Sequence, residues 1–291
     1  MKVVKFLGGL GNQMFQYAFL LSLKRIYKES ILMDVTIFET YGLHNGFELD
    51  QVFNITATKA TIDDIKKVTY YTQSYFKYRI YRKFFPQRKT EFREKHFYEF
   101  YPDVLKGEGY SYFDGYWQYF KYFDSCKENI KKEFSYKEDL DEKNQKIEDF
   151  LLENNNCVSI HVRRGDYLKH KLYRGLCGLD YYVKSIQMIR KQYPNVGKWL
   201  IFSNDISWCK DNLLSLLEGE NVIFVDWNVG KDSYKDMRLM SDCRINILAN
   251  SSFSWWAAYL NKHENSIVYA PNKWVNLPMK FKIQMPNWIL I

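Results

Sequence analysis

The residues of this sequence that could do chemistry gather behind one short apolar run. Residues 157–162 predict a strand buried in a parallel sheet, because a sheet covered on both faces carries a continuous apolar pattern. At its carboxyl end, the edge at which open α/β sheets bind ligands, stand His161, Arg163, Arg164 and Asp166. Two adjacent guanidinium groups there indicate an anion such as phosphate. The alternative is an ordinary surface ion pair at the turn.

Three polar clusters stand where later strands and helices are expected to meet. They are Ser203–Asn204–Asp205, Asp232–Ser233 and Asn250–Ser251–Ser252. Helix capping alone explains each of them. Because several such turns lie at the edge that carries the arginines, they also indicate a phosphate pocket, in which Ser251 and Ser252 are the best candidates for hydroxyl contacts.

The second half of the chain alternates strands with short helices. The expected strands are 157–162, 198–202, 222–226, 245–249 and 266–269, and the expected helices are 181–192, 207–217, 234–244 and 253–262. This alternation predicts a parallel, doubly wound α/β sheet. Trp255 and Trp256 are expected in its core, because small and apolar residues follow them on the same helix.

The chain begins with a strand at 3–7, a glycine-rich loop at 8–13, an apolar helix at 14–27 and a strand at 31–35. This order predicts a Rossmann-like unit whose helix N-terminus faces an anion or a sugar.

A nicotinamide-dependent oxidoreductase is an alternative for the same stretch. Gly9 and Gly11 begin the dinucleotide fingerprint, and Asp34 stands near the place of its ribose-binding acid. However, Met14 occupies the position of the third glycine, which weakens this interpretation because that glycine permits close packing of helix on strand.

The middle of the chain is harder to interpret. Residues 61–68 and the segment that follows them are expected to be helical, and 110–122 is an aromatic stretch without a clear type. Residues 137–156 form the expected linker, so we predict domains at 1–150 and 151–291. This linker contains a D-x-D spacing, Asp139–Leu140–Asp141, which we reject as a metal site because it lies among solvated charges.

One segment carries the whole formal charge of +8. Residues 66–95 hold ten Lys or Arg residues against Glu91 and Glu94, and aromatic residues lie between the cations. Nucleic-acid grooves and surfaces that rest on anionic membranes share this composition. A polyanion-binding or membrane-surface protein is therefore a second hypothesis, and a solvated helical face is the ordinary explanation.

Composition sets further limits on the 291-residue chain. Its 46% hydrophobic and 26% charged residues are typical of globular proteins, and 18% aromatic residues permit stacking on sugars or bases. Five widely spaced cysteines without a Cys-x-x-Cys pair favour reduced thiols in a cytoplasmic protein. No apolar run approaches the ~20 residues of a membrane span, and the N-terminus lacks the cleavage site of a signal peptide.

Four blocks resemble the α-1,2-fucosyltransferases of glycosyltransferase family 11. They are residues 8–16, residues 161–167, Ser203–Asn204–Asp205 with Trp208–Cys209, and the stretch from Asp236 through residues 250–260. The resemblance implies two Rossmann-like domains that face a cleft (GT-B type), GDP-fucose as donor, no metal, and inversion at the fucose anomeric carbon to give an α-1,2 link to galactose. The resemblance covers roughly the first 27 residues and most of 157–270, and it does not extend to the middle of the chain.

The resemblance also assigns roles. It implies that Arg163 holds the β-phosphate of the donor and that His161 and Asp236 contact the guanine or the nucleotide. Ser251 and Ser252 match phosphate-binding hydroxyls, and Gly11 and Asn12 match a loop that touches the donor from the other domain. The remaining donor-binding residues expected from the matching blocks are Ser203, Asn204, Asp205 and Phe253.

The general base stays open. Related α-1,6-fucosyltransferases have an acidic residue a few positions beyond the motif, where this chain has Lys171. Asp166 is the nearest carboxylate and is our candidate, although it could instead orient an arginine. Glu48 and Asp50 in the other domain are further candidates. A dissociative route would need no strong base.

Acceptor contacts are expected from His44, Glu48 and Asp50, which lie in a loop of the first domain. The expected acceptor is a galactose-terminated glycan, and lactose, a lipid-linked repeat unit and an O-antigen intermediate are all compatible. We expect no nucleic-acid partner, and a peripheral contact with the anionic inner face of the membrane.

Overall fold

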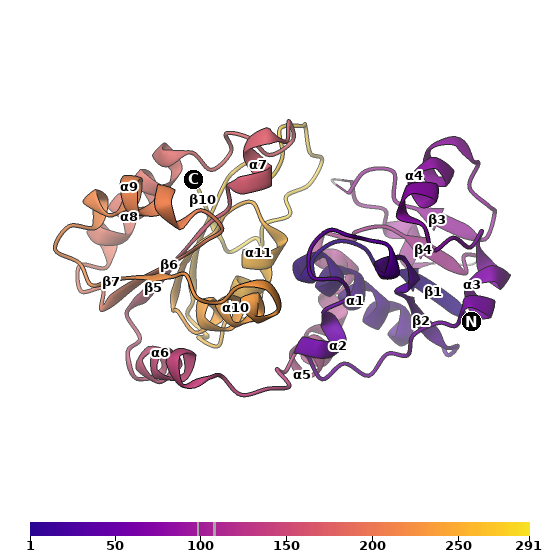
Figure 1. Ribbon diagram of the computed structural model, residues 1–291, viewed down its shortest axis with the longest axis horizontal. Coiled ribbons are helices and arrows are strands. Elements are labelled where there is room, and N and C mark those ends of the chain that lie inside the picture. The colour runs from indigo at the N-terminus through magenta and orange to yellow at the C-terminus, as the bar shows by residue number, and fades with distance from the viewer. Residues whose placement is uncertain (98, 107–108) are drawn as a thin grey trace. The chain divides into compact units, whose positions relative to one another are not determined.

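The computed structural model describes residues 1–97, 99–106 and 109–291. The chain forms two compact units, Met1–Glu138 with Met279–Ile283 and Asp139–Pro278 with Gln284–Ile291. Each unit contains a parallel sheet with helices, so the α/β class predicted from the sequence is confirmed (Figure 1). No helix in the described ranges is long and apolar enough to cross a membrane.

The division between the units falls at Glu138–Asp139, before the boundary expected at residue 150. Helix α6 (Glu142–Glu153) belongs to the second unit because two of its side chains are bound there. Asn144 exchanges hydrogen bonds with Asn228, and Glu148 pairs with Arg238 through Nε and Oε1 at 2.8 Å. The stretch expected as a linker is therefore mainly a packed helix.

The sheet of the first unit has the order β2-β1-β4-β3, with all neighbours parallel. Its strands are β1 (Lys2–Lys5), β2 (Ile31–Asp34), β3 (Glu91–Arg93) and β4 (Tyr112–Asp114). The stretch 110–122 thus supplies a central strand, and the basic segment supplies an edge strand. The sequence pattern missed both because each is only three residues long and carries charged residues.

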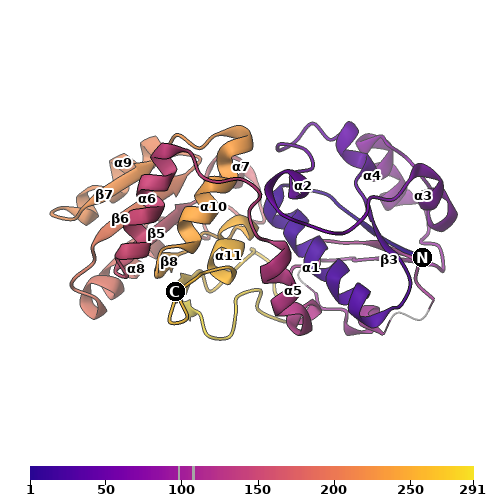
Figure 2. The same ribbon diagram turned by 90° about the horizontal axis from the view of Figure 1, so that it is seen from below.

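Helices cover both faces of this sheet (Figures 1 and 2). On one face lies α1 (Leu10–Ile26), whose Phe19 stacks on Trp117 and touches Phe113 of β4. On the other lie α3 (Ile62–Val68), whose Ile65 packs with Val3, and α4 (Tyr75–Phe84). Two shorter helices are α2 (Leu49–Val52) and α5 (Lys127–Glu133). Short 3-10 helices span Thr36–Glu39, Pro102–Leu105, Phe120–Tyr122 and Asp124–Cys126.

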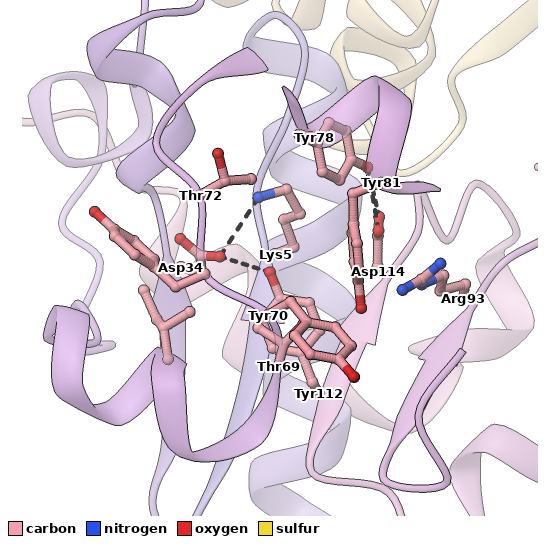
Figure 3. A pocket seen from close by; sticks show the side chains of 12 residues that line it. Lys5, Asp34, Thr69, Tyr70, Thr72, Tyr78, Tyr81, Arg93, Tyr112 and Asp114 are labelled. Atoms are coloured by element: carbon pink, nitrogen blue, oxygen red, sulfur yellow. Dashed lines mark hydrogen bonds and ion pairs between the residues drawn. The ribbon is translucent and has the colours of Figure 1, made fainter. Parts of the chain in front are cut away.

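Charged side chains are buried between the sheet and α4, as Figure 3 shows. The Asp34 carboxylate accepts a hydrogen bond of 2.6 Å from the Tyr112 hydroxyl and lies 3.4 Å from Lys5 Nζ. Burial raises the pKa of Asp34, but Lys5, Tyr112 and Thr36 outweigh it and hold that pKa below its ordinary value. Asp34 is therefore engaged inside the fold, which counts against its use as the ribose-binding acid of a nicotinamide site.

The sheet of the second unit has the order β10-β9-β8-β5-β6-β7 and is parallel throughout, as predicted. Its strands are β5 (Cys157–Val162), β6 (Lys198–Ser203), β7 (Val222–Val225), β8 (Ile245–Ile247), β9 (Ile267–Ala270) and β10 (Ile289–Leu290). β5 has the predicted bounds and is buried along its whole length. The unpredicted β10 adds an edge strand beside β9.

Helices also cover both faces of the second sheet (Figure 1). Helices α8 (Leu179–Gln192) and α9 (Ile206–Leu213) pack on the side chains of Val158 and Ile160, which form the core of this unit. The opposite face carries α10 (Tyr234–Ser241) and α11 (Ser252–Tyr259), and α7 (Gly165–Lys169) follows β5. Short 3-10 helices span Ser215–Leu217 and Gly230–Ser233.

Gly8→Ala is expected to destabilise the protein by about 2 kcal/mol. Gly8 has a φ of +90°, and a Cβ there would lie 2.6 Å from Asn12 Nδ2. Gly42→Ala is the matched control, because nothing lies within 4 Å of its Cβ position. Urea unfolding of both variants measures the difference. An equal effect of the two substitutions would contradict a conformational requirement at Gly8.

Candidate functional site

The carboxyl end of β5 presents Arg163 to solvent in a fixed orientation. Arg163 Nη2 donates a hydrogen bond of 2.8 Å to Asp166 Oδ1, and its guanidinium lies 5.4 Å from the centre of the Tyr167 ring. The Arg163 side chain is 30% exposed, so a ligand can still reach it. Asp166 therefore orients Arg163.

Arg164 is bound to the turn that follows β6. Its backbone N–H donates to Asn204 Oδ1 at 2.9 Å, and Nε donates to Asp205 Oδ2 at 3.0 Å. Its guanidinium also lies 4.2 Å from the centre of the Trp208 ring. Each of the two adjacent arginines pairs with one aspartate, and the Arg163 side chain is the more exposed, at 30% against 21%.

The polar side chains of the turn after β6 form hydrogen bonds within the protein. Ser203 Oγ accepts a hydrogen bond from the backbone N–H of Asp205, and Asp205 caps α9 through the N–H of Trp208. Asn204 Nδ2 leaves only 2.4 Å for a Cβ at Gly165, whose φ is +38°, so this position requires glycine. Donor contacts by Ser203, Asn204 and Asp205 remain predictions, and the contacts present are structural.

His161 is buried at the end of β5, where its ring lies 5.9 Å from that of Phe253. Its Nδ1 atom has no hydrogen-bond partner within the part of the chain that the structure describes. Burial, and then the charge of Arg163, lower the pKa of His161 from 6.5 to about 3. A neutral imidazole with an unused ring nitrogen can donate to or accept from a bound ligand.

His161 is expected to stay neutral as the pH falls from 7 toward 4, since its pKa is lowered to about 3. The unfolded chain binds a proton at this residue near the ordinary pKa of 6.5, so acidification below that value favours unfolding. Nitrogen-15 NMR of the His161 imidazole at several pH values checks this. A charged imidazole at pH 5 in the folded protein would contradict it.

The N-terminus of α11 lies in the same neighbourhood. Ser251 caps the helix, with Oγ accepting from the N–H of Phe253 at 3.3 Å, and its side chain is hydrogen-bonded to Tyr167. Tyr167 thus connects the Arg163 guanidinium with the start of α11, a role that the sequence analysis missed although it quoted Tyr167 in the motif. Ser252 is half-buried in the first turn. The expected core positions of Trp255 and Trp256 are confirmed.

Asp236 lies in the first turn of α10 within a network of side-chain amides. Its Oδ1 accepts a hydrogen bond of 2.8 Å from Asn228 Nδ2, and Asn228 in turn bonds Asn144. This is the side chain's one hydrogen bond within the described ranges, and it leaves Oδ2 for a ligand. Burial raises the pKa of Asp236 to about 7. No local sequence pattern marks Asn144 and Asn228, so neither was among the predicted site residues.

In the first unit, Gly11 and Asn12 lie in the first turn of α1 rather than in a loop before it. Asn12 Oδ1 accepts a hydrogen bond of 2.7 Å from Gln118 Nε2. His44 is exposed, has a φ of +60°, and lies beside the glycine turn, since a Cβ at Gly9 would be 3.2 Å from His44 Nδ1.

The other two expected acceptor residues have partners within the first unit. Glu48 is buried and accepts hydrogen bonds from Asn45 Nδ2 and from the N–H of Leu10, so it caps α1. Asp50 forms an ion pair with Lys59 at 2.5 Å. Of the three residues, His44 is the most exposed.

The D-x-D sequence has a structural explanation. Asp141 caps α6 through the N–H of Asn144 and pairs with Lys235 at 3.0 Å. Across the described residues, no group of three His, Cys, Asp or Glu side chains is placed to hold a metal ion.

Comparison with known proteins covers the whole chain. The model of the family described as Glycosyl transferase family 11 matches residues 1–291. An Escherichia coli alpha-1,2-colitosyltransferase is 34% identical over 94% of this chain and 91% of its own. The E. coli O-antigen biosynthesis glycosyltransferase WbnK is 33% identical over 97% of both chains. The mouse galactoside alpha-(1,2)-fucosyltransferase 2 is 26% identical over 87% of this chain and 66% of its own.

Solved structures support the fold. The fucosyltransferase NodZ from Bradyrhizobium aligns with a TM-score of 0.51 at 14% identity, covering 88% of this chain and 91% of its own. NodZ alpha-1,6-fucosyltransferase co-crystallised with GDP gives a TM-score of 0.50 at 15% identity, over 88% and 91% of the two chains. At this identity the likeness establishes the shared architecture, the GT-B type expected from the sequence.

Proposed function

The chain belongs to glycosyl transferase family 11, and from this premise we propose that it transfers L-fucose from GDP-β-L-fucose to the 2-hydroxyl of a terminal galactose. The product has an α-1,2 linkage, formed with inversion at the anomeric carbon. The names of an α-1,2-colitosyltransferase and a galactoside α-(1,2)-fucosyltransferase among its relatives support this linkage. The observation that carries the proposal is Arg163, oriented by Asp166 at the carboxyl end of β5.

The chemistry of the leaving group explains why such an arginine matters. Cleavage of the bond between fucose and phosphate leaves an additional negative charge on GDP. Arg163 is held in place before that charge develops, and the N-terminus of α11, capped by Ser251, presents backbone N–H groups nearby. In the proposed mechanism these groups offset the charge without a metal ion. His161 and Asp236 bind the nucleotide.

The acceptor hydroxyl loses its proton to Asp166 in this proposal. Oδ2 takes this proton, while Oδ1 keeps its ion pair with Arg163. A dissociative route, in which the proton leaves late, needs no strong base. An Asp166→Asn variant with unchanged activity would favour the dissociative route.

A second candidate donor is GDP-colitose, because the relative at 34% identity is named a colitosyltransferase. Colitose is fucose without the 3-hydroxyl, so both donors present the same diphosphate to Arg163. They differ only in whether the sugar pocket hydrogen-bonds a hydroxyl at that carbon, which makes a direct comparison of the two donors informative.

Product analysis tests the proposal. The protein is incubated with GDP-fucose or GDP-colitose and with lactose and other galactose-terminated acceptors, with and without EDTA, and the products are identified by mass spectrometry and linkage NMR. We expect an α-1,2-fucosylated product whose yield is unaffected by EDTA. Transfer from GDP-colitose alone would show that colitose, and not fucose, is the sugar transferred. Loss of activity in EDTA would overturn the metal-free mechanism. A product with another linkage would overturn the proposed acceptor position.

A further inference from the structure

One side of α4 exposes an apolar stripe. Phe76, Ile80 and Phe84 follow each other at four-residue spacing, which places them on one side of the helix. They are 71%, 39% and 68% exposed. Large apolar side chains that are contiguous and exposed mark an interaction surface more often than scattered ones do.

The opposite side of α4 accounts for the packing of the helix. Figure 3 shows Tyr78 pointing toward Asp114 of β4, with a hydrogen bond of 2.9 Å between the hydroxyl and Oδ1. Arg82 pairs with the same carboxylate. Because these buried contacts attach the inner side of α4 to the sheet, the apolar stripe is not needed to hold the helix in place.

Exposed cations flank the stripe. Lys77, Arg79 and Lys83 are exposed, and within the part of the chain that the structure describes none of them forms an ion pair with a carboxylate. The inward cations behave differently, since Arg82 pairs with Asp114 and Arg93 with Glu91. The sequence contains no Asp or Glu between Asp64 and Glu91. The outer side of α4 is therefore apolar along its middle and positively charged along its edges.

A hollow of about 820 Å³ adjoins this side of the molecule. Its lining includes Tyr70, Tyr71, Ile80 and Phe85, and Lys77 is the one charged residue among the described residues that line it. Aromatic and aliphatic surface beside a cation thus continues beyond the helix itself.

We propose that the outer side of α4, defined by Phe76, Lys77, Arg79, Ile80, Lys83 and Phe84, docks on the surface of an anionic lipid bilayer. The apolar stripe enters the boundary between headgroups and acyl chains, and the three cations lie at the level of the lipid phosphates. Exposed cations that form no ion pair with a carboxylate of the described residues match such a surface. The binding does not depend on the transferase activity, but in the proposed function it brings the enzyme to a lipid-linked acceptor.

Nucleic acid fits this surface less well. Proteins that bind single strands stack bases on aromatic rings inside a charged groove. Here the middle position of the stripe is Ile80, which has no aromatic face, and the stripe lies on the outer side of a helix. Insertion into a bilayer requires only an apolar ridge bordered by cations.

Vesicle flotation tests the proposal with the full chain. Vesicles of phosphatidylcholine alone are compared with vesicles that also contain phosphatidylglycerol. We expect binding to the anionic vesicles only, weakened by high salt. The triple variant Lys77→Gln, Arg79→Gln and Lys83→Gln is expected to bind roughly 100-fold more weakly, from the usual contribution of each basic residue near an anionic surface. The double variant Phe76→Ser and Phe84→Ser is expected to lose at least roughly 10-fold.

Matched controls use exposed residues elsewhere. Lys127→Gln with Lys131→Gln and Lys132→Gln removes the same charge from α5, and Leu152→Ser with Leu214→Ser removes apolar surface from the second unit. These variants are expected to float like the unsubstituted protein, and all variants should keep their GDP affinity and helical circular dichroism. Equal flotation of the α4 variants and the controls would overturn the proposal. Binding of single-stranded RNA that the α4 changes abolish, without vesicle binding, would also overturn it.

Discussion

Arg163→Ala is expected to lower kcat by roughly 100-fold or more while the protein stays folded. The guanidinium is fixed by Asp166 and lies against Tyr167, so its orientation exists before the diphosphate acquires its additional charge. Loss of one such preorganised donor removes stabilisation that is needed mainly in the transition state. Steady-state kinetics with GDP-fucose and a galactose acceptor measure kcat, and circular dichroism verifies the fold.

Two further variants separate orientation from charge. Arg163→Lys keeps the charge but loses the planar pair of donors, and we expect an intermediate kcat. Lys169→Ala removes an exposed cation from the end of α7 and serves as the matched control, with kcat unchanged. If Arg163→Ala retained near-normal kcat in a folded protein, the mechanism would have to place the diphosphate elsewhere.

GDP binding is expected to strengthen as the pH rises through about 7, because burial raises the pKa of Asp236 to about 7. Guanine offers two donors, N1–H and the 2-amino group, and an ionised carboxylate accepts from both. Below the pKa the carboxyl group is protonated in the free protein, so GDP must displace that proton to bind. Calorimetry near pH 6 in buffers of different ionisation enthalpy should therefore detect proton release.

Asp236→Asn is expected to weaken GDP binding roughly 100-fold and to remove the pH dependence near neutrality. Asparagine can keep the contact with Asn228 but presents an N–H group to the guanine donors. IDP lacks the 2-amino group, so it should bind the unsubstituted protein more weakly than GDP does. The substitution Asp236→Asn should also weaken IDP binding by a smaller factor than GDP binding. A pH dependence that persists in the variant would show that another group is responsible.

The second unit could be predicted closely from the sequence, and the first only in part. Strand β5 is buried along its whole length, so its apolar run is visible without knowledge of the fold. The strands β3 and β4 carry the charged residues Glu91, Arg93 and Asp114. Arg93 pairs with Glu91 in the same strand, but Asp114 pairs with Arg82, which lies 32 residues away in the chain. Periodicity cannot reveal a strand whose polar side chains are buried by partners that lie far away in the sequence.

The candidate site, too, could be predicted from the sequence only in part. Residue types and their order were enough to place Arg163 and Arg164 at the carboxyl end of a buried strand and to predict an anion site there. The sequence alone could not show that Arg163 pairs with Asp166 and Arg164 with Asp205 from the turn after β6, or that Arg163 is the more exposed of the two. It also could not assign Asp236 its raised pKa, which results from burial and is opposed by the hydrogen bond from Asn228.

The sequence by itself determined the parallel α/β class, the chemical character of the β5 edge and the excess of positive charge in residues 66–95, because these follow from local patterns and composition. Tertiary structure alone decided which charged groups form ion pairs, which carboxyl groups are buried, and which side of α4 faces outward. The physical reason is that pKa and exposure depend on neighbours in space, and for Asp114 and Arg82 those neighbours are 32 residues apart in the chain.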